Sequence, residues 1–151
     1  SNDSTSSYTM REGKLIETDD VFEAWTSKEF AKMIEALDSS TNLIDRHFLL
    51  MGIVDDTYKQ RKDNPEMKKI CARISERHIE EFPQIREALL KDMDAFLPRV
   101  TTFQKYATLL TEEGNYQKAI EVCEIALSHG LKDGTKTGFK GRIERIKKKV
   151  K

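Results

Sequence analysis

Residues 100–133 read VTTFQKYATLLTEEGNYQKAIEVCEIALSHGLKD, and this stretch decides the fold class. Apolar side chains recur every three or four residues on both sides of Gly114, which is typical of two amphipathic helices joined by a short turn. Gly130 suits the position just after a helix, where a positive φ is favoured, and Leu131 suits the apolar contact that accompanies it. The stretch therefore predicts a helical hairpin over residues 99–133, with helices at 99–113 and 115–129.

The spacing in this hairpin resembles a tetratricopeptide repeat, a helix–turn–helix unit of about 34 residues. If Val100 takes the first repeat position, Phe103 takes the fourth, where the family usually has a large aromatic side chain. Ala107 and Ala119 take the eighth and twentieth positions, where the two helices must approach closely. The further matches are Leu110, Gly114, Tyr116 and Ala126, at the eleventh, fifteenth, seventeenth and twenty-seventh positions. The pattern departs at the twenty-fourth position, where Cys123 replaces an aromatic residue, and at the thirty-second, where Leu131 replaces Pro.

Upstream of the hairpin the chain also has helical periodicity, interrupted by polar breaks. Thr26 and Glu29 have the spacing of a capping box and predict a helix start there. A second start lies within residues 38–42, a run of candidate caps before a helix over about 43–61. Asn64 and Pro65 suit the cap and the first position of the next helix, which Pro83 ends or kinks.

The two ends of the chain have different expected roles. Residues 1–20 have little periodicity and predict a mostly disordered tail, whereas the apolar cluster at 21–25 predicts a segment docked on the core. No alternation is long enough to predict a strand. Residues 137–149 resemble the helix that closes a repeat array, with Phe139, Ile143, Ile146 and Val150 on one face. We therefore expect one all-α domain over 21–151, a helical bundle or short α-solenoid that ends in the tetratricopeptide-like hairpin.

The net charge of zero is the sum of unequal parts. The chain has 26 basic and 26 acidic residues in 151, which excludes a uniformly basic nucleic-acid protein. Residues 1–40 nevertheless carry a net charge of −5, from four basic and nine acidic residues, and the last twenty carry +7, from nine and two. The candidate basic patch is Lys140, Arg142, Arg145, Lys147, Lys148 and Lys149. Such cations can bind phosphates, but they also stabilise the end of a helix and keep it soluble, and the second role is the commoner one.

No residue pattern predicts an enzyme, a metal site or a cofactor. Gly134, Thr135 and Lys136 do not have the order of a phosphate-binding loop, and none of the three histidines follows a glutamate by three residues. His47 and His78 lie near apolar stripes, so we expect them in the core or at its boundary. The two cysteines, distant in sequence and without a CxxC motif, favour a reducing compartment and hence the cytoplasm. No apolar run approaches the roughly 20 residues of a membrane span.

The resemblance implies that the inner face of the first hairpin helix binds a partner. The matching residues are Thr101, Gln104, Thr108 and Thr111, with Glu112 at the edge. The family version that grips a peptide carboxylate has Lys and Asn where Gln104 and Thr108 stand, so capture of acidic C-terminal peptides is not implied. This face is either open to a partner or covered by the upstream helices. We expect a non-enzymatic protein-interaction or scaffold module that can be part of a larger protein. The alternative is an accessory nucleic-acid-binding domain that uses the basic C-terminal helix.

Overall fold

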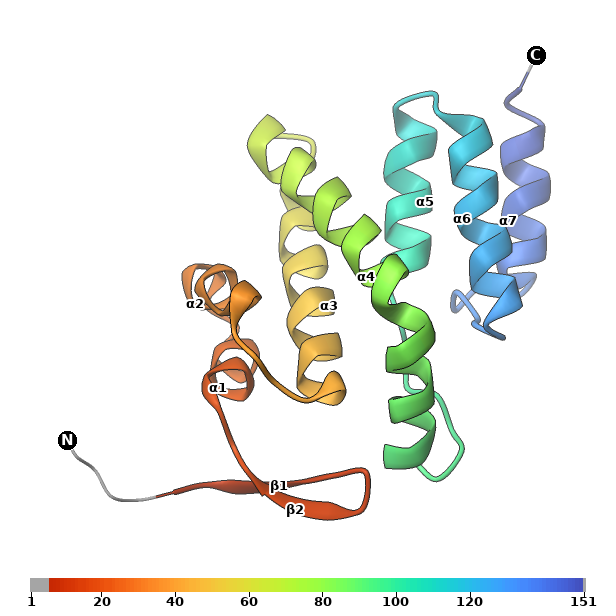
Figure 1. The fold of residues 1–151 in the computed structure, drawn as a ribbon. Helices are drawn as coiled ribbons and strands as arrows, with labels where there is room; N and C mark the ends of the chain where they lie inside the picture. The colour runs from red at the N-terminus through yellow and green to blue at the C-terminus, as the bar shows by residue number, and fades with distance from the viewer. Residues whose placement is uncertain (1–5, 151) are drawn as a thin grey trace.

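The computed structural model describes residues 6–150, and in this part of the chain helices dominate (Figure 1). The element order is β1 (Tyr8–Arg11), β2 (Lys14–Glu17), α1 (Asp20–Ser27), α2 (Phe30–Glu35), a 3-10 turn η1 (Ala36–Asp38), α3 (Leu43–Lys59), α4 (Pro65–Asp92), α5 (Thr102–Glu112), α6 (Tyr116–Ser128) and α7 (Gly138–Lys147). The predicted all-α fold class is thus confirmed, with one small β-hairpin added to it.

Three helix boundaries predicted from local sequence signals are confirmed. The Asn42 side chain accepts a hydrogen bond from the backbone N–H of Asp45 and caps α3. The Asn64 side chain accepts from two backbone N–H groups of α4, which has Pro65 at its first position. After α6, Gly130 has a φ of +75° and the N–H of Leu131 donates to the carbonyl of Ala126, closing the helix end.

The predicted capping box at Thr26 and Glu29 is wrong. Helix α1 begins earlier, because the Asp19 carboxylate accepts from the backbone N–H of Phe22 and caps that start. The Thr26 hydroxyl instead donates to the carbonyl of Phe22 within α1. Lys28, with a φ of +62°, then separates α1 from α2.

The apolar cluster at residues 21–25 packs on the core, as predicted. Val21 is fully buried. The Trp25 ring stacks on Phe48 of α3 at 4.8 Å between ring centroids, and its indole N–H donates to Asp45. This cluster therefore joins α1 to the start of α3.

The prediction of a disordered tail over residues 1–20 is wrong for the β-hairpin; residues 1–5 lie outside the described residues. Strands β1 and β2 pair antiparallel, with Thr9 opposite Ile16. Glu12 and Gly13 both have positive φ, which suits the tight turn that matches the twist of two paired strands. An ion pair of 2.8 Å between Arg11 and Asp45 ties the hairpin to α3.

Helix α4 continues through Pro83 and does not end there. It changes direction part-way along its length (Figure 1), as expected where proline removes a backbone donor from a helix. Phe82 and Ile85, on either side of the proline, are fully buried. Core packing of these flanking residues therefore keeps both halves of α4 in one helix.

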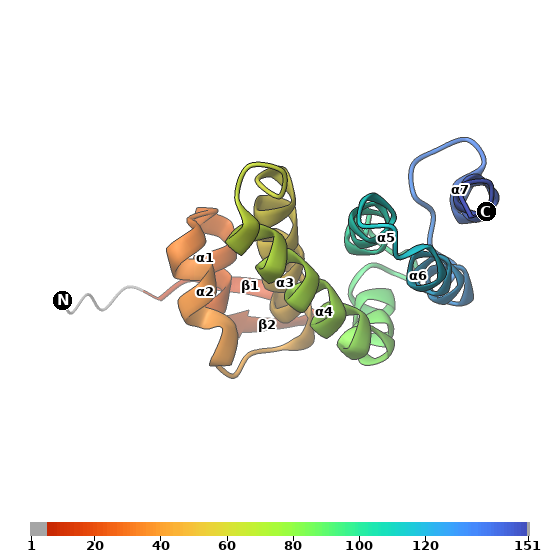
Figure 2. The same ribbon diagram turned by 90° about the horizontal axis from the view of Figure 1, so that it is seen from above.

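The C-terminal half of the fold is a layer of neighbouring helices. Helices α5, α6 and α7 lie side by side, with α4 against α5 (Figures 1 and 2). The close approach of α5 and α6 depends on Ala107 and Ala119, which are both fully buried. In α7, Phe139, Ile143 and Ile146 are buried as predicted. Val150 is not part of this face, because it follows the end of α7 and is 52% exposed.

Candidate functional site

A groove of about 310 Å³ separates α5 from α7, and it is lined by residues from both predicted binding sets. Helix α5 contributes Thr108, Thr111 and Glu112, and the C-terminal segment contributes Arg142, Arg145, Ile146 and Lys149. Residues three, four or seven apart share one face of a helix, so each segment presents one coherent wall. Three residues of each set, separate in the sequence, thus meet at one surface.

Arg142 is held in place across the groove. Its Nε donates to an oxygen of Asp133 at 2.9 Å, and its Nη1 donates to the Thr108 hydroxyl at 3.1 Å. Asp133 is buried and also accepts from the backbone N–H and the hydroxyl of Thr135. Burial alone would raise the pKa of Asp133, but hydrogen bonds from Thr135 and Arg142 outweigh it and hold that pKa below its ordinary value. The carboxylate is therefore ionised at neutral pH and fixes the guanidinium.

Asp133 was missed by the sequence reasoning. The available signal was its position as one of two acidic residues among nine basic ones in the last twenty. Charge counting alone cannot tell that this acid, and not Glu144, turns inward. Glu144 lies on the exposed face of α7, where it pairs with Lys147 at 3.5 Å.

Glu112, at the edge of the groove, is neutralised within the protein. Nε and Nη2 of Arg61 donate to the two Glu112 oxygens at 2.9 and 2.8 Å. This hydrogen bonding lowers the pKa of Glu112 despite a smaller opposing effect of burial. Arg61 also lies over the Tyr58 ring at 3.7 Å from its centroid, which restricts the guanidinium further. Among the described residues that line this groove, the charges not held in an ion pair are those of Arg145 and Lys149.

Thr101 and Gln104 do not line the groove, although both belong to the predicted binding set. The Thr101 hydroxyl donates to Asp55 of α3 at 2.7 Å, and Lys105 pairs with the same carboxylate at 2.6 Å. Gln104 is only 8% exposed and its side-chain oxygen is buried without a hydrogen-bond partner. The Thr101 hydroxyl is therefore engaged by α3 and Gln104 is buried, so Gln104 as a contact for a partner is wrong in this structure.

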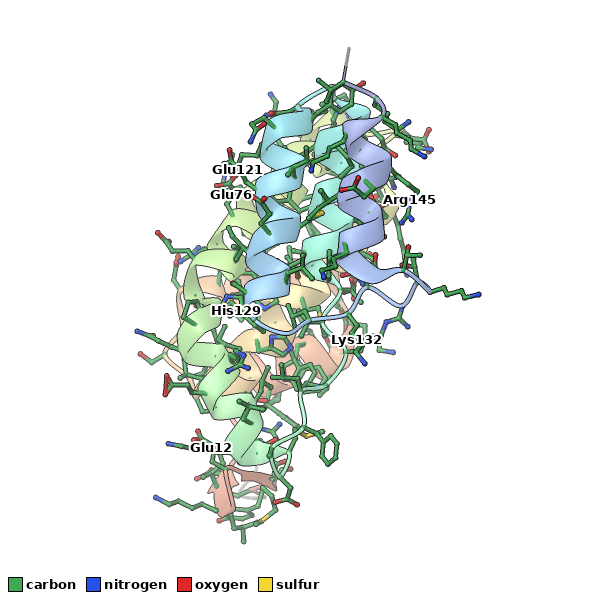
Figure 3. All side chains as sticks on the ribbon, turned by 90° about the vertical axis from the view of Figure 1, so that its right-hand side faces the viewer. Glu12, Glu76, Glu121, His129, Lys132 and Arg145 are labelled. Atoms are coloured by element: carbon green, nitrogen blue, oxygen red, sulfur yellow. The ribbon has the colours of Figure 1, made fainter. Side chains whose placement is uncertain are left out.

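The predicted basic patch is divided between different faces of α7. Lys140 and Lys147 are seven positions apart and share a face away from the groove, and Lys148 lies between the two faces. Arg145, in the last turn of α7, donates to the hydroxyl of Thr137 at 3.0 Å, so its side chain points back toward the start of that helix. Figure 3 shows Arg145 of α7 and Glu121 of α6 on opposite sides of these two helices.

A chain of buried polar groups links α3, α4 and α5. His47 Nδ1 lies 2.9 Å from His78 Nε2, and His78 Nδ1 lies 2.7 Å from the Thr102 hydroxyl. Burial lowers the pKa of His47 to about 4 and lowers that of His78 well below its ordinary value. Both rings are thus neutral at pH 7. The predicted core location of the two histidines is confirmed, whereas their pairing with each other and with Thr102 was not foreseen.

Two kinds of feature are absent from residues 6–150. No group of three or more His, Cys, Asp or Glu side chains in this part of the chain converges as metal ligands would. None of the helices described there combines the length and the apolar character that crossing a bilayer requires. Cys71 and Cys123 are buried free thiols whose pKa is raised by burial.

The chain is similar to a known protein whose description states no activity. A protein of Aquifex aeolicus (strain VF5), described as an "Uncharacterized protein", is 28% identical over 123 residues, which are 82% of this chain and 55% of that relative. The chain thus spans about half the length of the curated relative it matches. No family model and no solved structure matches the chain.

Proposed function

We propose that this chain is a non-enzymatic protein-interaction module and that the α5–α7 groove holds a segment of its partner. The observation that carries the proposal is the convergence of Thr108, Thr111, Arg142, Arg145 and Lys149 on one groove. The resemblance to tetratricopeptide repeats supports it, because that family binds along the inner face of the first hairpin helix. In this chain only the second half of that face is open.

The groove suits an extended acidic segment. The Thr111 hydroxyl donates to the carbonyl of Ala107, so its oxygen remains available as an acceptor for an N–H group. The Thr108 hydroxyl donates to the carbonyl of Gln104 and already accepts from Arg142, so it helps to fix that wall of the groove. Arg145 and Lys149 supply charged donors at the opposite wall. Because Arg142 is already held by Asp133, it shapes the groove and needs no ordering when a partner binds.

The test is selection of binding peptides on the whole protein, followed by mapping of the selected peptide by amide chemical shifts. We expect the shifts to fall on residues 108–112 and 142–149. Thr111→Arg should block the groove and abolish binding. Gln117→Arg adds the same charge on an exposed position of α6, outside the groove, and should leave binding unchanged. Shifts confined to other surfaces, or equal binding by both variants, would contradict the proposal.

The alternative function is nucleic-acid binding through α7. It is favoured by the exposed cations Lys140, Lys148 and Lys149, which form no ion pair with a described carboxylate. Binding of an oligonucleotide should then weaken steeply with salt. Neutralising Lys140, Lys148 and Lys149 together should remove it, whereas neutralising the exposed lysines Lys59, Lys62 and Lys69 should not. Salt-independent binding would exclude this mechanism.

The proposed location of the protein is the cytoplasm. It is supported by the two buried free thiols, since a reducing compartment keeps such cysteines unpaired.

A further inference from the structure

A second and larger hollow lies at the opposite end of α5 from the Glu112 edge of the groove. It has a volume of about 680 Å³ and is formed by the last turns of α4, the connection from α4 to α5, and the segment that follows α6. Three cations, Arg86, Arg99 and Lys132, line it together with apolar side chains such as Leu90 and Leu97. The size lies within the range of about 300–1,000 Å³ that is usual for small-molecule sites.

The positive charge in this hollow is uncompensated. No Asp or Glu lines it, and none of the three cations pairs with a carboxylate within residues 6–150. Other arginines of this protein, such as Arg46 and Arg61, are held in ion pairs. Cations left without partners in a concave site create a positive potential that attracts an anion.

The two arginines are anchored so that donors remain for a ligand. Nε of Arg86 donates to the backbone carbonyl of His129 at 3.0 Å, which leaves the Nη groups of Arg86 without a partner among the described residues. Arg99 lies against the backbone of the α6–α7 connection, because a side chain at Gly134 would come within 3.7 Å of its Nη2. Burial, and then the charge of Arg86, lowers the pKa of His129, in keeping with a positive local potential.

One side of the hollow is apolar. Leu90, Leu97, Val100 and Leu131 contribute to its lining, and Phe96 at its rim is 75% exposed. Phe96 follows Asp94 and Ala95, whose φ values of +52° and +72° are costly for residues other than glycine. A strained connection thus holds a large aromatic ring in solvent beside three cations, a combination that core packing does not explain.

We propose that this hollow is a binding site for an organic anion with an apolar tail. Its carboxylate or phosphate head is held by Arg86, Arg99 and Lys132, and its tail lies against Leu90, Leu97 and Phe96. The planar guanidinium groups offer paired N–H donors that match either head group. The site is independent of the α5–α7 groove.

The experiment is titration of the full chain with octanoate and octyl phosphate, followed by calorimetry and amide chemical shifts. We expect both to bind with shifts at residues 86–99 and 129–134, and the stronger of the two identifies the preferred head group. Inorganic phosphate, which lacks the tail, and octyltrimethylammonium, which reverses the charge, should bind at least about tenfold more weakly. Equal binding of octyltrimethylammonium would overturn the proposal, because the site would then be apolar only.

Matched variants separate this site from other surfaces. Arg99→Gln or Lys132→Gln, both at exposed positions, should each weaken octyl phosphate about tenfold without changing the helical circular dichroism. Arg73→Gln removes an exposed arginine of α4 outside the hollow, and Thr111→Arg blocks only the α5–α7 groove. Neither variant should change the affinity for octyl phosphate. Unchanged affinity in both Arg99→Gln and Lys132→Gln would overturn the assignment, whatever the outcome at the groove.

Discussion

Acidification from pH 7 to pH 5 should destabilise this protein through the buried pair His47 and His78. Burial lowers the pKa of His47 from 6.5 to about 4, so between these values the unfolded chain binds a proton that the folded chain does not. Above pH 6.5 the His47 ring is neutral in both the folded and the unfolded chain, so it has little effect on the free energy of unfolding. As the pH falls below 6.5, stability decreases, and the decrease is complete once the folded state also takes up the proton near pH 4.

The size of the effect follows from the pKa difference. Each unit corresponds to about 1.4 kcal/mol, so His47 alone should cost about 2 kcal/mol at pH 5 and about 3 kcal/mol at pH 4. His78, whose pKa is also lowered, acts in the same direction. The pKa values of Asp45, Glu112 and Asp133 are held below their ordinary values, so these carboxylates contribute mainly at lower pH.

The assay is urea unfolding followed by circular dichroism at pH 7, 6 and 5, in the native chain and in His47→Asn. An asparagine amide offers both a donor and an acceptor near the position of Nδ1 but does not titrate. The variant should be less stable at every pH, yet its loss between pH 7 and 5 should be smaller by about 2 kcal/mol. His129→Asn, at a partly exposed ring, should reduce the loss less. An equal loss in the native chain and in His47→Asn would refute the reasoning.

Three further outcomes test the helical packing and the groove. Ala107→Leu should overpack the α5–α6 contact and cost about 1–3 kcal/mol in urea unfolding, and a neutral result would mean that this contact is not close. Asp133→Asn should leave Arg142 without its counter-ion and cost about 1–3 kcal/mol; exposed Glu144→Gln is the control, and equal stability of the two variants would contradict the role of Asp133. Deletion of residues 137–151 should expose the apolar surface beneath α7, lowering solubility and thermal stability, and an unchanged melting temperature would disprove the closing role of α7.

Features decided within a few residues were predictable. Such features are the helix caps Asn42 and Asn64 and the glycine that follows α6, Gly130. Their side-chain and backbone hydrogen bonds span at most five positions. The β-hairpin was not predictable, because four-residue strands carry little signal and its anchor, Asp45, is 34 positions from Arg11. The capping box at Thr26 failed because Thr26 lies inside α1, which Asp19 caps upstream, and its hydroxyl bonds to the carbonyl of Phe22 within that helix.

The candidate groove shows the same division. The sequence by itself determined that Thr108 and Thr111 share one helical face, and that Arg142, Arg145 and Lys149 share another, since helical spacing is a local property. Only the tertiary structure decided that these faces meet, that Gln104 is buried, and that Asp133 turns inward to hold Arg142. These outcomes depend on where helices distant in sequence pack against each other, and no residue carries that information alone.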